Sequence, residues 1–93
     1  MTTFFMFGSY SKESLEGIDA LRTEKAKKLI QDAGGETVGI YTLLGSTDLV
    51  LIVELPDIEA AAKISLGLSR LTGARFQTAP ALDIDTFDAI AAE

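Results

Sequence analysis

The run Leu49-Val50-Leu51-Ile52-Val53-Glu54-Leu55 decides the fold of this chain, because every side chain in it except Glu54 is apolar. Such a run predicts a strand buried on both faces, whereas a strand covered on one face alternates apolar and polar residues. A chain of 93 residues has few residues left for the second face of a sheet once helices cover the first. We therefore expect a partner on that face, most simply a second copy of the chain.

A glycine-containing turn precedes this strand. Gly45-Ser46-Thr47 separates it from a second strand that we predict over residues 36–44, and the short loop indicates a hairpin. Regular alternation along residues 36–44 places Thr37 and Tyr41 on one face of the sheet. The apolar run and its neighbour therefore form half of a predicted sheet.

The segment after the apolar run predicts a helix and then a strand. Asp57 is the expected N-cap of a helix that runs to Thr72, and Gly73 ends this helix. Residues 74–81 follow as a strand. Pro80 places this strand at a sheet edge, because proline has no amide donor for a neighbour on both sides.

The N-terminal part predicts a strand followed by a helix in two pieces. Residues 3–10 are rich in aromatic side chains and have apolar residues on both faces of the expected strand. Residues 11–33 have the apolar spacing of a helix. Gly17 interrupts that helix, and Thr23 is the expected cap of its longer second piece. Gly34-Gly35 ends it, since glycine readily adopts the left-handed conformation.

The predicted elements follow the order β-α-β-β-α-β, with a short helix after them that begins near Asp85-Thr86-Phe87-Asp88. This order indicates an α+β, ferredoxin-like fold in a single domain over residues 1–93, with a four-stranded antiparallel sheet and two helices on one face. The odd-numbered residues of the apolar run are expected to face the helices. Val50 and Ile52 are expected to face the partner.

The composition favours self-association. Apolar residues make up 47% of the chain, and the mean hydropathy is +0.26. These values favour a buried oligomer interface, although alanine-rich helices raise them as well. We predict a homodimer that packs sheet face against sheet face, buries about 1,500 Å² and has no stable folded monomer.

The net charge and the absence of targeting segments argue against nucleic acids and membranes as partners. The formal net charge is −6, which repels phosphate backbones, so we expect no nucleic acid. No apolar run of membrane-spanning length is present, and we expect no membrane partner. The N-terminus lacks the basic segment of a secretory signal. A cytoplasmic location is therefore the expectation.

Several residue types are missing from the chain. It contains no Cys, His or Trp, which excludes an imidazole base, a Ser-His-Asp triad, a His-ligated haem and a Cys/His zinc site. No glycine pair matches a phosphate-binding fingerprint. We therefore expect no cofactor and no metal.

Three polar side chains are the candidates for a ligand-binding or catalytic site. Asp48 would act as a general base or hydrogen-bond acceptor, although a turn aspartate also bonds nearby amides. Tyr41 would be a proton donor or ligand contact in the cleft between the sheet and the helices, although such a tyrosine more often packs its ring and bonds its hydroxyl to the backbone. Arg75 would hold an anionic ligand, although an arginine more often pairs with acidic side chains at the surface. We prefer Arg75 to Arg22 and Arg70 because it opens a strand.

Glu54 is a second carboxylate on the same strand face as Asp48. The two lie six residues apart, about 20 Å along a strand, so they do not form a catalytic pair. Glu54 is expected to pair with a lysine or arginine at the interface with a partner copy, or to lie near solvent. Ser9 and Tyr10 are further polar groups, at the end of the first strand.

Several of these features together resemble the GYD-domain family of small bacterial and archaeal proteins. They are the turn Gly45-x-x-Asp48, the apolar strand with Glu54, Pro56-Asp57 before an alanine-rich helix, Tyr10, Gly34-Gly35, Tyr41 and the C-terminal Phe-Asp helix. The resemblance spans nearly the whole chain and implies a ferredoxin-like fold of the dimeric α/β-barrel type. Thr47 replaces the tyrosine of the family's Gly-Tyr-Asp signature. Because the family has no defined activity, the resemblance implies no chemistry.

Three functional hypotheses follow. The first is a homo-oligomeric module that binds or senses a small molecule through Tyr41, Asp48 or Arg75. The second is a cofactor-free isomerase or lyase in which Asp48 is the base and Tyr41 the acid. The third is a structural subunit that assembles through its strands. The fold alone does not choose among them, and we rank the binding module first.

Overall fold

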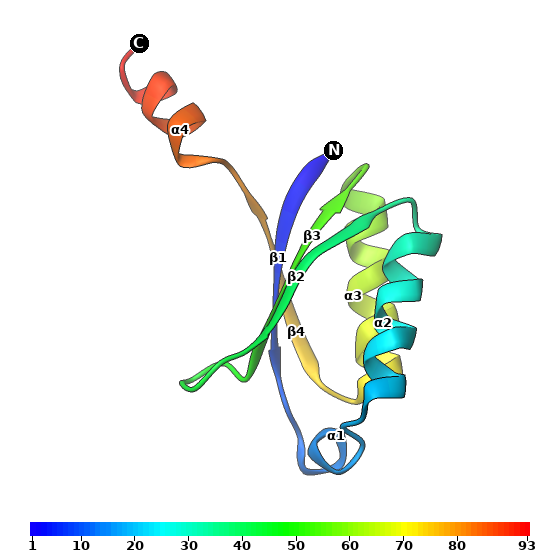
Figure 1. Cartoon of the computed structure of the whole chain (residues 1–93). Helices are drawn as coiled ribbons and strands as arrows, with labels where there is room; N and C mark the ends of the chain where they lie inside the picture. The colour runs from blue at the N-terminus through cyan, green and yellow to red at the C-terminus, as the bar shows by residue number, and fades with distance from the viewer.

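Four strands form one antiparallel sheet in the computed structural model, which describes residues 1–93. They are β1 (Thr2–Ser9), β2 (Glu36–Thr42), β3 (Leu49–Leu55) and β4 (Arg75–Ala81), and their order across the sheet is β2-β3-β1-β4. The helices α2 (Ala20–Asp32) and α3 (Ile58–Thr72) lie side by side on one face (Figure 1). The predicted α+β, ferredoxin-like arrangement is therefore confirmed.

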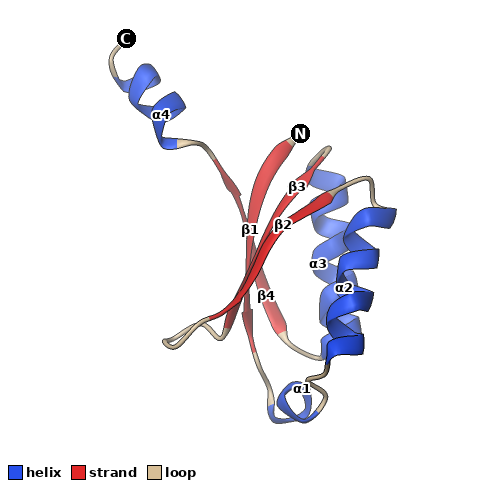
Figure 2. Ribbon diagram, in the orientation of Figure 1, coloured by secondary structure: helices blue, strands red, loops and turns tan.

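Two shorter helices complete the chain. Helix α1 (Lys12–Glu16) lies between β1 and α2, and α4 (Ile84–Ala91) follows β4. Figure 2 shows α4 beyond the end of the sheet, on the side away from α2 and α3. None of the four helices is long and apolar enough to cross a bilayer.

Aspartates begin the longer helices. Asp57 accepts a hydrogen bond from the amide of Ala60 at 2.8 Å, as predicted for the N-cap of α3. The predicted start of α2 at Thr23 is wrong, because Asp19 is the N-cap and accepts from the amide of Arg22 at 2.7 Å. The Thr23 hydroxyl instead donates to the Asp19 carbonyl within the first turn.

The helix ends also use local sequence signals. Gly73 has a φ of 76° and Gly34 a φ of 83°, the left-handed region in which glycine carries no steric cost. Both glycine stops are therefore confirmed. The N-cap of helix α4 is Asp83, whose carboxylate accepts from the amide of Asp85, and it lies two residues before the predicted cap at Asp85.

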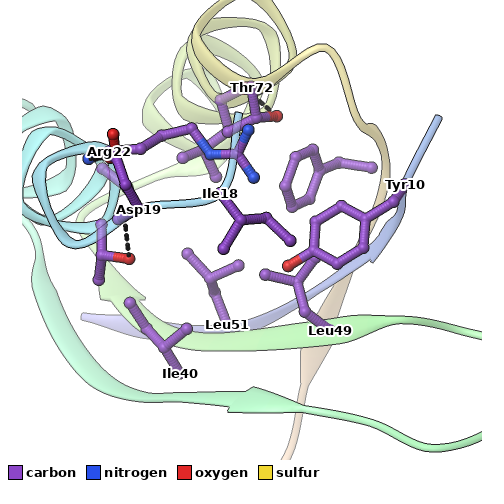
Figure 3. A pocket seen from close by; sticks show the side chains of 12 residues that line it. Tyr10, Ile18, Asp19, Arg22, Ile40, Leu49, Leu51 and Thr72 are labelled. Atoms are coloured by element: carbon purple, nitrogen blue, oxygen red, sulfur yellow. Dashed lines mark hydrogen bonds between the residues drawn. The ribbon is translucent and has the colours of Figure 1, made fainter. Parts of the chain in front are cut away.

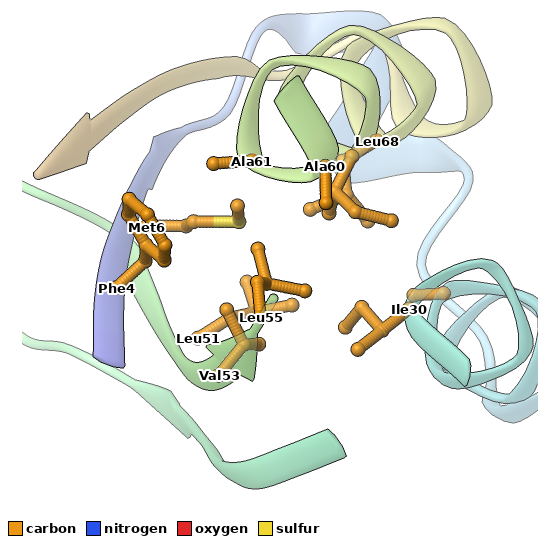
Figure 4. Close-up of a cluster of buried hydrophobic side chains, with 11 residues drawn as sticks. Phe4, Met6, Ile30, Leu51, Val53, Leu55, Ala60, Ala61 and Leu68 are labelled. Atoms are coloured by element: carbon orange, nitrogen blue, oxygen red, sulfur yellow. The ribbon is translucent and has the colours of Figure 1, made fainter. Parts of the chain in front are cut away.

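The hydrophobic core lies between the helices and the sheet (Figure 4). Leu51, Val53 and Leu55 of β3 point into it and are at most 2% exposed, which confirms the predicted facing of the odd-numbered residues. Fully burying one such side chain stabilises the fold by about 1.5–3 kcal/mol. The rest of the core cluster comes from β1 and the two long helices: Phe4, Met6, Ala26, Ile30, Ala60, Ala61, Ile64 and Leu68.

A β-bulge in β2 changes which residues share a face. Thr37 lies opposite Val53, but the next paired residue is Gly39, opposite Ile52, so the register shifts between them. Thr37 therefore faces the helices with Val53, while Tyr41 shares the other face with Val50. The prediction that Thr37 and Tyr41 lie on one face is wrong, because regular alternation does not allow for the extra residue.

The face of the sheet without helices is apolar at its centre, and we call it the open face. The register places Phe5 opposite Ile52 and Phe7 opposite Val50 on this face, with Ala79 of β4 beside Phe5. The rings of Phe5 and Phe7 lie 6.2 Å apart between centroids, within the range of aromatic pairs. The prediction that β3 is apolar on both faces is therefore confirmed, and no element of the chain covers the second one.

Candidate functional site

A cavity of about 70 Å³ lies between the sheet and the helices, at the end of the sheet near α1 (Figure 3). At about 30 Å³ for each water in the liquid, this space holds about two groups the size of a water molecule. Most of its lining is apolar, with side chains from the sheet below and from α2 and α3 above. The apolar lining residues are Ile18, Ala26, Ile40, Leu49, Leu51, Leu68 and Phe76.

Arg22 brings the only cationic side chain into this cavity. Its guanidinium donates one hydrogen bond to the carbonyl of Ser14 at 2.8 Å. The ion pairs of the molecule involve Lys27 and Lys28, so no carboxylate lies within ion-pair distance of Arg22, although Asp19 also lines the cavity. A guanidinium has five N–H donors, and the contact with Ser14 leaves the others free for a ligand.

Tyr10 lines the cavity from the opposite side. Figure 3 shows its ring and the side chain of Arg22 reaching toward the space from different segments. The phenolic hydroxyl both donates and accepts hydrogen bonds. Asp19 and Thr23 add polar groups near Arg22, but the Asp19 carboxylate is already the N-cap of α2. The cavity thus combines an apolar interior with a cation and a phenol.

Asp48 does not line the cavity, but it fixes a residue that does. Its carboxylate accepts a hydrogen bond from the amide of Tyr10 at 2.7 Å, and its own amide donates to the carbonyl of Gly8 at 2.9 Å. The two bonds tie the start of β3 to the end of β1. The Asp48 carboxylate therefore accepts a hydrogen bond from a backbone amide, as a turn aspartate does. The amide belongs to Tyr10, which follows β1, and not to a residue of the β2–β3 hairpin.

Tyr41 lies on the open face and is 58% exposed, so the prediction that its phenol enters the cleft between the sheet and the helices is wrong. Its ring lies over Gly39, where an added Cβ atom would be 2.8 Å from the ring atom Cε2. Gly39 is paired with Ile52, four residues and about 13 Å along β3 from Asp48. The structure therefore does not bring the Tyr41 phenol to the Asp48 carboxylate.

Arg75 opens β4 beside Ser9 and is exposed. It lines a separate surface hollow with Phe7 and Gln77, outside the cavity. Tyr41, Asp48 and Arg75 thus all lie outside the cavity lining, and only Asp48 is connected to it through a hydrogen bond.

Glu54 is bonded to a hydroxyl group. Its carboxylate accepts from the Thr3 hydroxyl on the neighbouring strand β1, and neither ion pair of the molecule includes it. Within one chain, the Thr3 hydroxyl is therefore the partner of Glu54, and a basic partner from a second copy stays a prediction. No group of three acidic, histidine or cysteine side chains is placed to hold a metal ion.

Sequence reasoning expected a cleft between the sheet and the helices but not the residues that line it, because the lining comes from six separate parts of the chain. It considered Arg22 as an anion ligand but preferred Arg75, since Arg75 opens a strand. One signal was available: the break between Gly17 and Asp19 turns the chain back over the end of the sheet. That turn brings Ile18 and Arg22 above the strands.

A comparison with solved structures finds a similar fold in a regulatory protein. The crystal structure of the leucine response regulatory protein LrpA from Mycobacterium tuberculosis matches with a TM-score of 0.58 and 13% sequence identity. The match covers 88% of this chain and 51% of the regulator, so the chain spans about half of that protein's length. At this identity the likeness shows a shared fold alone.

Comparisons of the sequence give a family. Among curated proteins, no sequence matches this chain. The model of the GYD domain matches residues 4–91, which include all four strands after the first residues of β1, both long helices and α4. Because the match covers nearly the whole chain, this protein belongs to the GYD domain family.

Proposed function

We propose that the protein is a homodimeric module that binds a small organic anion in the cavity between its sheet and its helices. The observation that carries this proposal is the unpaired guanidinium of Arg22 in an apolar cavity. A guanidinium that has no ion-pair partner in the protein can bind the carboxylate of a ligand through two parallel hydrogen bonds.

The lining suggests the class of ligand. Leu49, Leu51 and Phe76 offer an apolar surface to a hydrocarbon group, while Arg22 and Tyr10 offer donors to an acid group. A cavity of about 70 Å³ fits a short aliphatic chain, with the acid group at the mouth. Short aliphatic carboxylates therefore match the site in size and in charge.

A direct titration tests the ligand class. Calorimetry is carried out with aliphatic carboxylates of four to six carbons, with leucine, which the name of the similar regulator mentions, and with the matching neutral amides. We expect binding of carboxylates and not of amides. The variant Arg22→Gln should weaken binding by roughly 10- to 100-fold, because a hydrogen bond to a charged group contributes about 1.5–3 kcal/mol.

A matched variant controls for general effects of charge. Arg70 is exposed on α3 and does not line the cavity, so Arg70→Gln should leave the affinity unchanged. Equal binding of acids and amides, or no binding of any carboxylate in the millimolar range, would contradict the proposed ligand class. An unchanged affinity in Arg22→Gln would contradict the proposed site.

The exposed surface supports the dimer. The chain exposes 6236 Å², whereas a compact monomer of 9.9 kDa exposes about 5,200 Å². The excess of about 1,000 Å² is similar to the area that each partner buries in a stable interface, about 800 Å². The apolar open face, with the half-buried Phe5, Phe7 and Ile52, is the sheet surface that a second copy would cover.

Sedimentation equilibrium tests the assembly. We expect a homodimer at micromolar concentration, and we expect Ile52→Asp to produce monomers because it places a charge at the centre of the open face. Ala62→Asp, on the exposed side of α3, is the control and should leave the dimer intact. A wild-type monomer at micromolar concentration would overturn the proposed assembly.

A further inference from the structure

The C-terminal segment, residues 82–93, extends away from its own domain, and we call it the arm. Figure 1 shows its helix α4 beyond the end of β4, on the side of the open face. No residue of α4 is buried, and its apolar side chains Ile84, Phe87 and Ile90 are 53–65% exposed. An isolated helix of eight residues is unstable in water, so the arm needs a surface to pack on.

The arm is amphipathic and acidic. Ile84, Phe87 and Ile90 recur at helical spacing on one side of α4, and Asp85 and Asp88 lie toward the other. The whole arm contains four acidic residues and no Lys or Arg: Asp83, Asp85, Asp88 and Glu93. A complementary surface would therefore be apolar with a positive charge at its border.

Two shallow hollows lie at the opposite end of the sheet; the one at the β2–β3 turn has the more apolar lining, and the one beside Arg75 is mostly polar. The two adjoin, have a volume of about 310 Å³ each and are both lined by Phe7, Ser46 and Thr47. One extends to Leu44, which is fully exposed at the tip of the β2–β3 turn, and the other to Arg75. We call the two hollows together the hairpin groove. Arg75 is its only charged lining residue and has no ion-pair partner.

The arm of the same chain does not reach this groove. Strand β4 begins at Arg75 beside the groove and ends at Ala81 before the arm, which separates the two by about 20 Å. Helix α4 has eight residues and is about 12 Å long. Only Leu82 and Asp83 connect it to β4, so it would fall short of Arg75 even if it folded back.

A second copy removes this difficulty. When two open faces pack around a two-fold axis that runs across the strands, the arm end of each protomer lies over the hairpin end of the other. Each arm then fills the hairpin groove of the other protomer, and the two-fold axis makes the two contacts equivalent. The apolar side of α4 would meet Phe7 and Leu44, and its acids would meet Arg75.

We propose that the arm of each protomer docks in the hairpin groove of a second copy. This inference rests on the proposed homodimer and adds which surfaces meet and in which orientation. It makes the arm part of the interface, in place of an exposed tail. It also gives the unpaired Arg75 and the exposed Leu44 a shared role in recognition of the partner.

Disulfide cross-linking tests the contact in the full-length chain, which has no cysteine of its own. Leu44→Cys is mixed with ¹⁵N-labelled Ile90→Cys under mild oxidation, and a mixed disulfide is identified by its intermediate mass. Ala89→Cys serves as a second arm position that leaves the apolar side intact. Leu66→Cys, exposed on α3, is the control partner and should not cross-link to the arm.

The outcomes separate this inference from the proposed function. A 44–90 or 44–89 disulfide supports the arm in the groove. A dimer in which the arms cross-link only to each other overturns this inference and leaves the dimer standing. A monomer overturns both, while titration with carboxylates reports on the cavity independently.

A charge exchange provides a second test. We expect Arg75→Glu to raise the dimer dissociation constant roughly tenfold, because it places like charges in the groove. The variant with both Asp85→Lys and Asp88→Lys should weaken the dimer in the same way, and a mixture of the two variants should form heterodimers. Arg70→Glu, outside the groove, is the control. A mixture that associates no better than either variant alone would overturn the proposed contact.

Discussion

Gly35 shows how closely the chain is packed where α2 turns into β2. A Cβ atom at this position would lie 2.4 Å from the side chain of Leu55 and 2.7 Å from the carbonyl oxygen of Glu54. The backbone carbonyl does not move aside as a side chain would. The glycine is therefore required by the approach of two backbone segments, in addition to its place in the helix stop.

Replacing Gly35 with alanine should destabilise the protein. We expect a loss of about 1–3 kcal/mol in the free energy of unfolding, which is typical of overpacking, measured by urea denaturation. Gly45 has no neighbouring atom within 4 Å of the same added atom, and Gly45→Ala is the matched control with no expected change. Equal stability of the two variants would contradict the close approach at Gly35.

The Asp48 carboxylate should matter for stability through Tyr10. Asp48→Ala removes the acceptor for the Tyr10 amide, and we expect a loss of about 1–3 kcal/mol in urea denaturation, because it leaves a donor unsatisfied. Asp48→Asn keeps an acceptor oxygen and should retain most of the stability. If Asp48→Ala were as stable as the wild-type protein, the hydrogen bond would not contribute to the fold.

At the scale of elements, the sequence predicted the features that depend on neighbouring residues along the chain, namely helix caps and the apolar pattern of a strand. Asp57 and Gly73 mark the ends of α3 by capping, and the apolar run predicted β3 with its two faces. The bulge between Thr37 and Gly39 was missed because it depends on how β2 pairs with β3. Its consequence, the placement of Tyr41 on the open face, was missed with it.

The cap of α3 provides a prediction at this scale. Asp57→Ala should cost about 1 kcal/mol in the free energy of unfolding, because the amide of Ala60 loses its acceptor. Asp57→Ser retains an N-cap oxygen and should restore most of that loss. Circular dichroism during thermal unfolding gives the comparison, and an equal loss in both variants would indicate that the carboxylate acts in some other way.

At the scale of the whole molecule, the chain is elongated. Its radius of gyration is 14.0 Å, whereas a compact domain of this length has about 12 Å. The arm and the β2–β3 turn account for this shape in Figure 1. The sequence predicted an uncovered face from the apolar run, but not the arm, because nothing local to residues 82–93 says where the helix points.

Removal of the arm should separate assembly from folding. A chain of residues 1–81 retains all four strands, both long helices and the core cluster, so we expect its circular dichroism spectrum to show the same sheet and packed helices. We also expect it to be monomeric at concentrations at which the full chain is dimeric, as measured by sedimentation equilibrium, in place of the sequence-based prediction that no folded monomer is stable. An unfolded 1–81 chain would show that the arm stabilises its own domain.

The position of β3 has a consequence for how the two proposed activities relate. Leu49 and Leu51 line the cavity, and Val50 and Ile52 lie on the open face, so one layer of backbone separates a ligand from a partner. Thermodynamic linkage is reciprocal. If a bound anion shifts β3 toward the position that the dimer prefers, it raises the affinity between protomers. Assembly then raises the affinity for the anion by the same factor.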